Sequence, residues 1–504
     1  PPMTAKLPSF APGEAGLDRR TFVKGISAAG LGLALAPALS AAQAVAPRRR
    51  YAIVGTGGRH AMYRDAIISD YKDHAELVAL CDINPGRLEL SRSRAAQRGA
   101  KVPGYAAADF DRMIRETKPD FVIVTTVDAT HNEYIVRALE AGCDAITEKP
   151  MTTTAEKCQG ILEARKRTGR NVRVTFNYRY SPPRTQVKDL LMSGEIGDIL
   201  SVDFHWLLNT VHGADYFRRW HSLKKNSGGL MVHKASHHFD LVNWWLGAVP
   251  ELVTAVGKRE FYTPAMAKRL GLQSHHERCH TCPEKEACTF FFDLAANPNL
   301  KALYLDQERH DGYFRDRCVF RPEIDIEDTM NVVVKYDTGA TLSYSLNAFN
   351  AWEGYQIAFN GTKGRLEHTI VEQIYVSGTD TVQGGIAAGG VKTRVIPLRG
   401  AARDFEPWTG EGGHGGGDRV MRDDIFLPQP PADKYRRASD ERGGAASSLV
   451  GIAVNRCFQT GQQVKIADLV SGLRRPDYAP MPTHAEPVPM PPRSSPRRGA
   501  PAPG

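Results

Sequence analysis

The stretch RRRYAIVGTGGRHAMYRDAI (Arg48–Ile67) reads as an apolar strand, a glycine turn and a helix. Gly55 and Gly57 form a G-x-G pattern directly after the strand. Gly55 would allow the tight turn, and Gly57 would let a pyrophosphate approach the backbone at the helix N-terminus. His60 replaces the third glycine of the usual fingerprint, so a plain tight turn remains the alternative interpretation of these residues alone.

Strands and helices alternate after this turn. AELVALCDIN (75–84), PDFVIVTTV (119–127) and DAITEKP (144–150) predict strands, and HNEYIVRALEAGC (131–143) predicts a helix. This alternation is typical of parallel βαβ units. The fold class is therefore α/β, with a Rossmann dinucleotide-binding domain predicted over residues 47–172.

Asp82 indicates which dinucleotide the domain prefers. It ends the second predicted strand, 27 residues after Gly55. A carboxylate there can accept hydrogen bonds from both ribose hydroxyls and would repel a 2′-phosphate. Asn84 follows soon after, rather than an arginine. NAD(H) is therefore favoured over NADP(H).

The pattern changes from about Val172. SVDFHWLL (201–208), MNVVVKYDTGATLSYSLNAF (330–349) and YQIAFNGTKGRLEHTI (355–370) alternate apolar and polar residues, with turn signals at TG and NG. Such a pattern is typical of antiparallel hairpins. A second domain with a mainly antiparallel sheet is predicted over residues 173–473.

Both ends of the chain are more basic than its middle. Of a formal net charge of +9, residues 1–50 hold five net positive charges and residues 474–504 hold three. The body between them is nearly neutral, which excludes a nucleic-acid footprint and nucleic acid as a partner. The Pro-rich segment 474–504 predicts a disordered tail.

The N-terminal charge belongs to a targeting pattern. Arg19 and Arg20 precede an apolar Gly/Ala/Leu-rich segment and then small residues near Ala42 and Ala44. This predicts a twin-arginine signal peptide over residues 1–46, with a membrane anchor as the alternative. The export machinery would be a partner, and the protein would reach the periplasm or otherwise be exported. Proteins using this route fold before export, often around a bound cofactor.

Several ordered motifs carry a family resemblance. GTGGRH (55–60), Asp82, EKP (148–150) and GG…HKASHHFD (228–240) together resemble the Gfo/Idh/MocA oxidoreductases, as do SGEIGDI (193–199) and TGQQVKIADL (460–469). The resemblance covers roughly residues 50–472. It implies a Rossmann domain that binds NAD, a C-terminal α/β domain with an open, mainly antiparallel sheet, a carbohydrate substrate at their junction, and a homo-oligomer.

The same resemblance implies roles for individual residues. Lys149 matches a lysine that touches substrate hydroxyl and nicotinamide ribose, and His237 matches the usual acid/base. His233 stands where the family carries an aspartate, and three interpretations stay open: a proton relay, a metal ligand with His237, or a structural histidine. Lys234 is predicted to be exposed. The full predicted cofactor set is Gly55, Gly57, Gly58, Arg59, Asp82, Thr126, His131, Glu148 and Lys149.

Two further segments are candidates for substrate contact. Tyr216, Arg219 and Trp220 combine aromatic rings with a guanidinium, which suits a sugar ring with hydroxyls or a carboxylate. A basic exposed helix is the alternative for this segment. His414 lies in a glycine-rich stretch that either closes over the substrate or forms a plain flexible connection.

A cysteine cluster lies between the predicted sheet strands. Cys279, Cys282 and Cys288, followed by Cys318, occupy an insertion near residues 275–320. Four thiolates suit a structural zinc site or an iron–sulfur cluster, although an exported protein could instead form two disulfides, and free thiols remain the third option.

These features predict an NAD-dependent oxidoreductase that moves a hydride to or from a secondary alcohol of a sugar or cyclitol. Free NAD is not expected outside the cytoplasm, so the cofactor would be tightly held and recycled. Two alternatives are kept: an NAD-dependent glycoside hydrolase that works by transient oxidation and elimination, and a non-catalytic exported sugar-binding protein.

Overall fold

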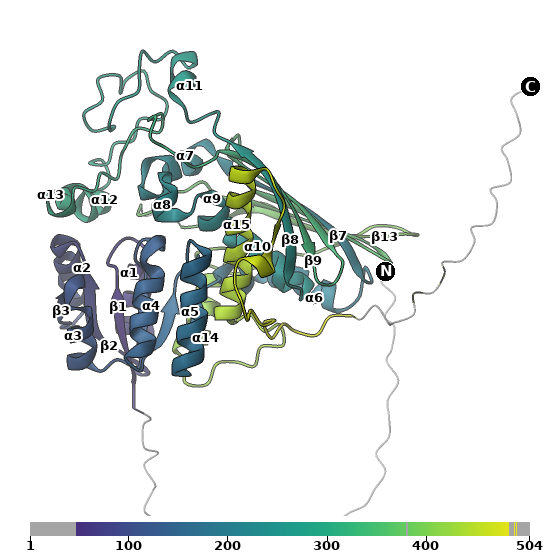
Figure 1. The fold of residues 1–504 in the computed structure, drawn as a ribbon, viewed down its shortest axis with the longest axis horizontal. Helices are drawn as coiled ribbons and strands as arrows, with labels where there is room; N and C mark the ends of the chain where they lie inside the picture. Colours follow the sequence, from purple (N-terminus) through teal and green to yellow (C-terminus); the bar gives the residue numbers. More distant parts are fainter. Residues whose placement is uncertain (1–46, 380–381, 483–487, 489, 491–504) are drawn as a thin grey trace, which may run out of the picture. The chain divides into compact units, whose positions relative to one another are not determined.

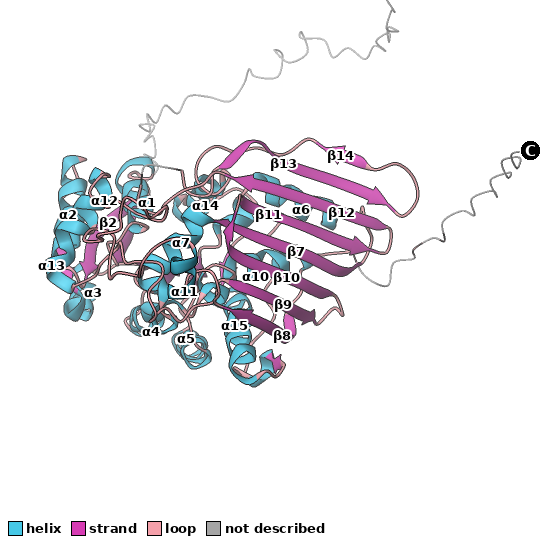
Figure 2. Ribbon diagram, turned by 90° about the horizontal axis from the view of Figure 1, so that it is seen from above, coloured by secondary structure: helices cyan, strands magenta, loops and turns pink. Residues whose placement is uncertain are grey.

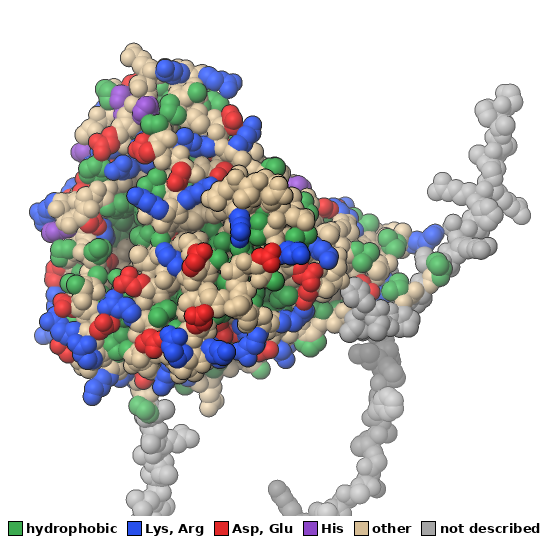
Figure 3. Space-filling view, viewed as in Figure 1, with side chains coloured by type: hydrophobic (Ala, Val, Ile, Leu, Met, Phe, Trp, Pro, Cys, Tyr) green, Lys and Arg blue, Asp and Glu red, His purple; other side chains and the backbone are tan. Residues whose placement is uncertain are grey.

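The computed structural model describes residues 47–379, 382–482, 488 and 490 (Figure 1). The predicted signal peptide, residues 1–46, lies outside the described residues. Among those described, no helix is both long enough and apolar enough to span a membrane. Basic and acidic side chains are interspersed over the face drawn in Figure 3.

The first sheet has seven strands in the order β15-β6-β5-β4-β1-β2-β3. Its strands are β1 (Arg49–Val54), β2 (Ala75–Asp82), β3 (Gly104–Ala106), β4 (Phe121–Val124), β5 (Asp144–Thr147), β6 (Val172–Val174) and β15 (Ser439–Asp440). All pairs are parallel except β15 with β6. Its helices are α1 (His60–Asp65), α2 (Pro85–Gln97), α3 (Phe110–Thr117), α4 (His131–Glu140) and α5 (Ala155–Thr168), with short turns η1 (Ala66–Asp70), η2 (Ala107–Asp109) and η3 (Asp128–Thr130). The predicted Rossmann fold is confirmed.

The second sheet has nine strands in the order β14-β13-β12-β11-β7-β10-β9-β8-β16. They are β7 (Ile199–Asn209), β8 (Pro250–Lys258), β9 (Thr329–Tyr336), β10 (Thr341–Asn350), β11 (Glu353–Gly361), β12 (Gly364–Glu372), β13 (Ile386–Pro397), β14 (Arg403–Phe405) and β16 (Val464–Lys465). Only the β7–β10 pair is parallel, so the prediction of an open, mainly antiparallel sheet is confirmed.

Helices cover one face of this sheet, as Figure 2 shows. Those behind it are α6 (Pro182–Met192), α10 (Ser236–Leu246) and α15 (Glu441–Thr460). Shorter elements connect them to the first sheet: η4 (Asn177–Tyr180), α7 (Thr210–Arg218), η5 (Trp220–Ser222), α8 (Lys224–Ser227), α9 (Leu230–His233), α14 (Gly417–Phe426) and η7 (Ile466–Asp468). Alternating apolar residues on β9 and β10 point into this layer, because successive side chains of a strand face opposite sides.

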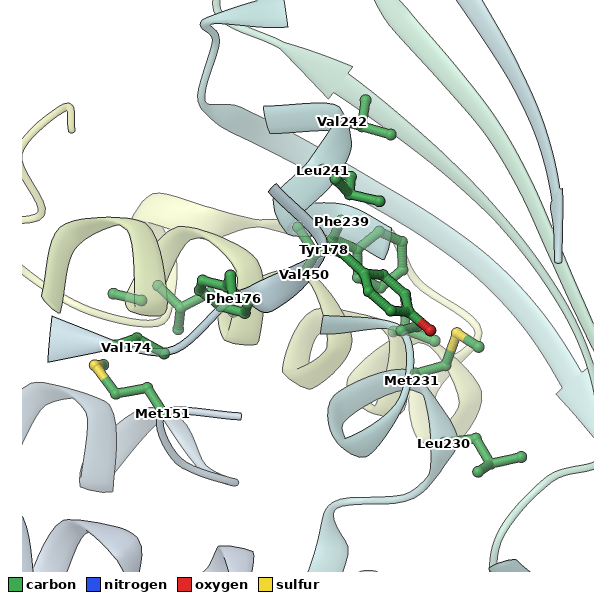
Figure 4. Close-up of a cluster of buried hydrophobic side chains, with 14 of the residues drawn as sticks. Met151, Val174, Phe176, Tyr178, Leu230, Met231, Phe239, Leu241, Val242 and Val450 are labelled. Atoms are coloured by element: carbon green, nitrogen blue, oxygen red, sulfur yellow. The ribbon is translucent and has the colours of Figure 1, made fainter. Parts of the chain in front are cut away.

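The two sheets share a hydrophobic core. Figure 4 shows Met151, Val174 and Phe176 next to Val450 of α15 and Tyr178 of η4. All five belong to one buried cluster that continues into the second sheet. The junction is therefore a packed interior and not a loose hinge.

The chain also returns to the first sheet near its end. Strand β15 adds to the edge at β6, and Phe426 of α14 packs its ring 5.1 Å from that of Tyr51 on β1. The Rossmann domain is therefore not made of residues 47–172 alone, because residues 417–440 cover part of its apolar surface.

A long insertion, residues 259–328, separates β8 from β9 and contains the predicted cysteine segment. Its helical elements are α11 (Pro264–Arg269), α12 (Pro298–Leu303), η6 (Leu305–Gln307) and α13 (Glu308–Asp311). Leu300, Leu303 and Tyr304 form a small core with Leu294, and Leu90 of α2 packs against it. This β8–β9 insertion thus rests on the first sheet's helices.

The beginning of the Pro-rich tail is ordered, contrary to the prediction for residues 474–504. Tyr478 and Ala479 are buried, and the Met481 sulfur accepts a hydrogen bond from the buried Lys188 ammonium. Arg475 forms an ion pair with Asp337. The sequence pattern missed these contacts because proline content outweighed the few apolar residues that the tail buries.

Gly451 offers a test of how α15 supports α9. A Cβ at this position would collide with the backbone of Met231 in α9, which carries His233 at its end. Gly451→Ala should lower the free energy of unfolding by about 1–3 kcal/mol in urea titrations. Gly160→Ala, in α5 with open space at its Cβ, should instead stabilise by up to about 1 kcal/mol. Equal effects of the two changes would contradict this packing.

Candidate active site

One cavity of about 500 Å³ lies between the first sheet, the helical elements that follow β7 and the β8–β9 insertion. Every predicted cofactor and substrate residue lines it, as do His233 and His237. His221, in the candidate substrate segment, and Lys234 also line the cavity. Further lining residues that the sequence did not single out include Asp128, Asn177, Tyr178, His212, Tyr304, Asp311, Tyr313 and Tyr375.

The glycine turn after β1 forms one wall. Gly55 has φ +91°, and a Cβ there would lie 2.7 Å from the backbone of Thr125, so β1 and β4 approach too closely for any other residue. At Gly57 a Cβ would meet only the Tyr304 hydroxyl, at 3.9 Å. The turn therefore offers bare backbone to the cavity, as a pyrophosphate requires.

Asp82 lies beside this turn. Its carboxylate accepts hydrogen bonds from the Thr56 hydroxyl at 2.8 Å and from the Asn84 backbone N–H at 2.7 Å. It is almost fully buried and lines the cavity at the end of β2. Together with the open backbone at Gly57, these residues fit the adenosine half of NAD.

Arg59 and Glu148 link the turn to the EKP loop. Arg59 Nε donates to Glu148 Oε1 at 2.6 Å, and the Tyr63 hydroxyl donates to the same oxygen at 2.7 Å. Burial opposes ionisation of Glu148, but Arg59, Tyr63 and Lys149 together outweigh it and lower the pKa of this carboxyl. The pair fixes the loop that presents Lys149.

Thr126 and His131 form the floor of the cavity. His131 Nδ1 lies 2.8 Å from the Pro150 carbonyl, and its Nε2 lies 3.2 Å from the Thr126 carbonyl. Burial lowers the pKa of His131. This imidazole thus holds the loop after β4 against the EKP loop.

Lys149, His233 and His237 line the same cavity as the glycine turn. Lys149 Nζ donates to the His233 carbonyl at 3.1 Å. Burial lowers the pKa of Lys149 to about 8, with Asp128 opposing the shift. The structure brings the three predicted catalytic side chains to one cavity, and their roles stay predictions.

His237 is a buried, neutral imidazole. Its ring stacks on Tyr178 with centroids 4.4 Å apart, and its Nδ1 has no hydrogen-bond partner among the described residues. Burial, with Lys149 and Lys234 nearby, holds the pKa of His237 well below its usual range. Such a group can accept a proton from a hydroxyl placed in the cavity.

Asp128 is a functional candidate that the sequence interpretation missed. Its Oδ2 lies 2.6 Å from His233 Nδ1, and both groups are buried. Burial raises the pKa of Asp128, although Lys149 and Arg219 oppose the shift. A carboxylate from the loop after β4 therefore lies beside His233. The only signal was its place two residues after Thr126, and its partner is 105 residues away.

The predicted substrate residues form the remaining walls. Arg219 reaches the Asp215 carboxylate at 3.4 Å, and its Nε has no partner among the described residues. Trp220 stacks on His221 with ring centroids 3.6 Å apart. His414 lies 2.9 Å from Asp418 and is buried, so its glycine-rich stretch packs against the cavity.

Lys234 and His212 were not predicted to face the site. Lys234 is buried rather than exposed: its Nζ lies 3.3 Å from the Tyr178 hydroxyl and 4.9 Å from the centre of the Trp206 ring. His212 Nδ1 lies 2.8 Å from the buried Glu353 carboxylate. His212–Glu353 is therefore a third imidazole–carboxylate pair at the cavity, besides Asp128–His233 and His414–Asp418.

The predicted metal centre at the four cysteines is not supported. All eight cysteines are free thiols, and no group of three or more His, Cys, Asp or Glu among the described residues is placed to hold a metal ion. Burial raises the pKa of Cys279, Cys282 and Cys288, which favours thiols over thiolate ligands. Arg278 instead ties the insertion together through Asp316 at 2.7 Å and Glu308 at 2.6 Å.

Comparison with known proteins agrees with this geometry. The family model for the NAD-binding Rossmann fold of the Gfo/Idh/MocA oxidoreductases matches residues 49–176, and the one for the C-terminal alpha/beta domain matches residues 188–466. The chain belongs to the Gfo/Idh/MocA oxidoreductase family. The family assignment made from the sequence motifs is thus confirmed.

Individual relatives differ in how much of the chain they match. "Putative oxidoreductase YteT" of Bacillus subtilis (strain 168) is 37% identical over 81% of this chain and 95% of its own. Inositol 2-dehydrogenase of Salmonella typhimurium is 34% identical over 34% of this chain and 47% of its own length. Among solved structures, the aldose-aldose oxidoreductase of Caulobacter crescentus shares the fold, with a TM-score of 0.54 over 83% of this chain and 100% of that one at 18% identity.

The Asp128 carboxylate should set the charge state of Lys149. Asp128→Asn removes the negative charge that favours the ammonium, so the pKa of Lys149 should fall below about 8. Titration of the labelled lysine by NMR measures this shift. Glu284→Gln, which removes the carboxylate of the His276 pair in the insertion, should leave Lys149 unchanged. A Lys149 pKa that is the same in all three proteins would exclude the coupling.

Proposed function

We propose that this Gfo/Idh/MocA family member is an NAD-dependent oxidoreductase that transfers a hydride to or from a secondary alcohol of a sugar or cyclitol. The observation that carries the proposal is a single cavity with a bare glycine turn on one wall and Lys149, His233 and His237 on another. The relatives that match part of the chain, inositol 2-dehydrogenase of Salmonella typhimurium among them, support a polyhydroxylated substrate.

The proposed division of labour follows from the charges of the free site. A bound nicotinamide would supply hydride transfer at the carbinol carbon. His237, neutral because it is buried, takes the hydroxyl proton during oxidation and gives it back during reduction. The Lys149 ammonium stabilises negative charge on the same oxygen. Asp128 holds His233 through its Nδ1, which leaves Nε2 available toward the cavity.

Tight retention of the cofactor and export by the twin-arginine route belong to this proposal. The Arg19–Arg20 pair and the apolar segment that follows support export. A cofactor loaded before export must be recycled in place, so each turnover would end with the nucleotide in its starting redox state. The cover that the β8–β9 insertion places beside the glycine turn supports retention.

Changes at Lys149 test the enzyme proposal. Lys149→Ala should preserve substrate binding and lower turnover by roughly 10²–10⁴-fold, because charge stabilisation at the reacting oxygen is lost. Stopped-flow absorbance of the reduced nicotinamide at its characteristic band measures the rate. Unchanged turnover would remove Lys149 from the mechanism.

The pH dependence gives a second test. Since the pKa of Lys149 is about 8, the ammonium is lost as the pH rises through 8, and the rate should fall on this alkaline limb. Lys149→Arg keeps a cation at all working pH values. Its pH profile should lack the limb even if its rate is low. A limb that persists in Lys149→Arg would assign it to another group.

A second candidate function is an NAD-dependent glycoside hydrolase. It is favoured by the His212–Glu353 pair, since elimination after transient oxidation requires a further base for a carbon-bound proton. Purified protein with no added cofactor, given aryl glycosides, should release the phenol under this candidate. A simple dehydrogenase would release none, and a non-catalytic sugar-binding protein would bind the glycoside without any change in nucleotide absorbance.

A further inference from the structure

The β8–β9 insertion reaches across the two Rossmann loops that surround the dinucleotide half of the cavity. At the glycine turn, the Gly58 backbone N–H donates to the Tyr304 hydroxyl at 3.2 Å. At the loop after β2, Asn84 Nδ2 donates to the Gln307 carbonyl at 3.1 Å. Next to this loop, Arg87 pairs with Asp311. All three contacts come from one short segment of the insertion, residues 304–311.

Tyr304 lies where a pyrophosphate would meet the turn. Its hydroxyl accepts from Gly58 and would be the nearest neighbour of a Cβ at Gly57, at 3.9 Å. Among the described residues no acceptor receives the proton of this hydroxyl. A buried phenol that is held at a glycine turn and has a proton to donate is suited to a phosphate oxygen.

Asp311 changes the charge beside Asp82. Arg87 Nη2 lies 3.8 Å from Asp82 and 2.5 Å from Asp311, and all three residues line the cavity. An arginine near the ribose carboxylate is the feature that admits a 2′-phosphate in NADP-binding domains. Here two carboxylates flank one guanidinium, so this corner has net negative charge.

We infer that residues 304–311 of the β8–β9 insertion are a third wall of the dinucleotide site, in which Tyr304 binds the pyrophosphate and Asp311 selects NAD over NADP by pairing with Arg87. The inference rests on the NAD-dependence in the proposed function and adds two binding residues to it. The ligand is the adenosine diphosphate part of a dinucleotide with a free 2′-hydroxyl.

The wall is anchored independently of any ligand. Arg278 pairs with Glu308 next to η6, and Arg315 pairs with the buried Asp215 of α7 at 2.6 Å. A Cβ on Gly86 would collide with the Gln307 side chain, so the first turn of α2 is shaped to receive the segment. Preorganised groups of this kind lower the cost of ordering on binding.

Nucleotide fluorescence with NADH and NADPH tests the inference by binding alone. Asp311→Asn frees Arg87, so the ratio of the NADPH to the NADH dissociation constant should fall about tenfold or more. Tyr304→Phe keeps the ring in its apolar cluster and removes the hydroxyl, so the NADH dissociation constant should rise about threefold to tenfold. Asp306→Asn breaks an exposed pair with Lys301 in the same segment and should change neither.

The outcomes separate the inference from the proposed function. If the wild-type protein binds neither nucleotide, the proposed NAD-dependence is wrong, and the inference fails with it. A second outcome is that wild-type protein binds NADH, while the Asp311→Asn and Tyr304→Phe variants melt normally and bind both nucleotides as Asp306→Asn does. This outcome would overturn the third wall and leave the proposed function intact. The third wall is supported if Asp311→Asn lowers the ratio of the NADPH to the NADH dissociation constant and Tyr304→Phe raises the NADH dissociation constant.

Discussion

The ammonium of Lys149 is partly buried at the junction of the two sheets, and the arrangement of the site follows from the need to keep that charge there. Burial disfavours the ammonium, so the pKa falls to about 8. Asp128 opposes the shift from the loop after β4, and Glu148 does so from the neighbouring position. Burial lowers the pKa of His233 and of His237 well below the usual range, and the Lys149 cation adds to both shifts. Desolvation and one nearby cation together therefore favour the neutral form of both imidazoles.

The sequence predicted those parts of the site whose residues lie close together along the chain. The glycine turn follows β1 directly, and the EKP motif follows β5, so βαβ connectivity alone brings both to the carboxyl edge of the sheet. The His233–His237 stretch was found for a similar reason. In each case residues that are close together in the sequence are also close together in the folded site.

Contacts between distant segments could not be predicted in this way. Asp128 and His233 form a pair only after two domains have packed, and no local pattern marks a carboxylate as the partner of that imidazole. Lys234 was predicted to be exposed because lysine usually is, but here its ammonium lies over the rings of Trp206 and Tyr178. The metal prediction failed because four cysteines in one insertion suit a metal site, but their presence in the sequence does not show that Cys279 is buried beside Arg218.

The return of the chain to its first sheet also bears on how the molecule is made. Tyr51 and its neighbours on β1 are covered by Phe426, and the sheet gains its last strand only at Ser439–Asp440. During synthesis, a ribosome that has released the first 180 residues has therefore produced an open sheet with an apolar face and an unpaired edge. Such surfaces promote aggregation until they are covered. The nascent chain must wait for more than 250 further residues before its nucleotide-binding half can close, so nearly the whole polypeptide has to be translated first.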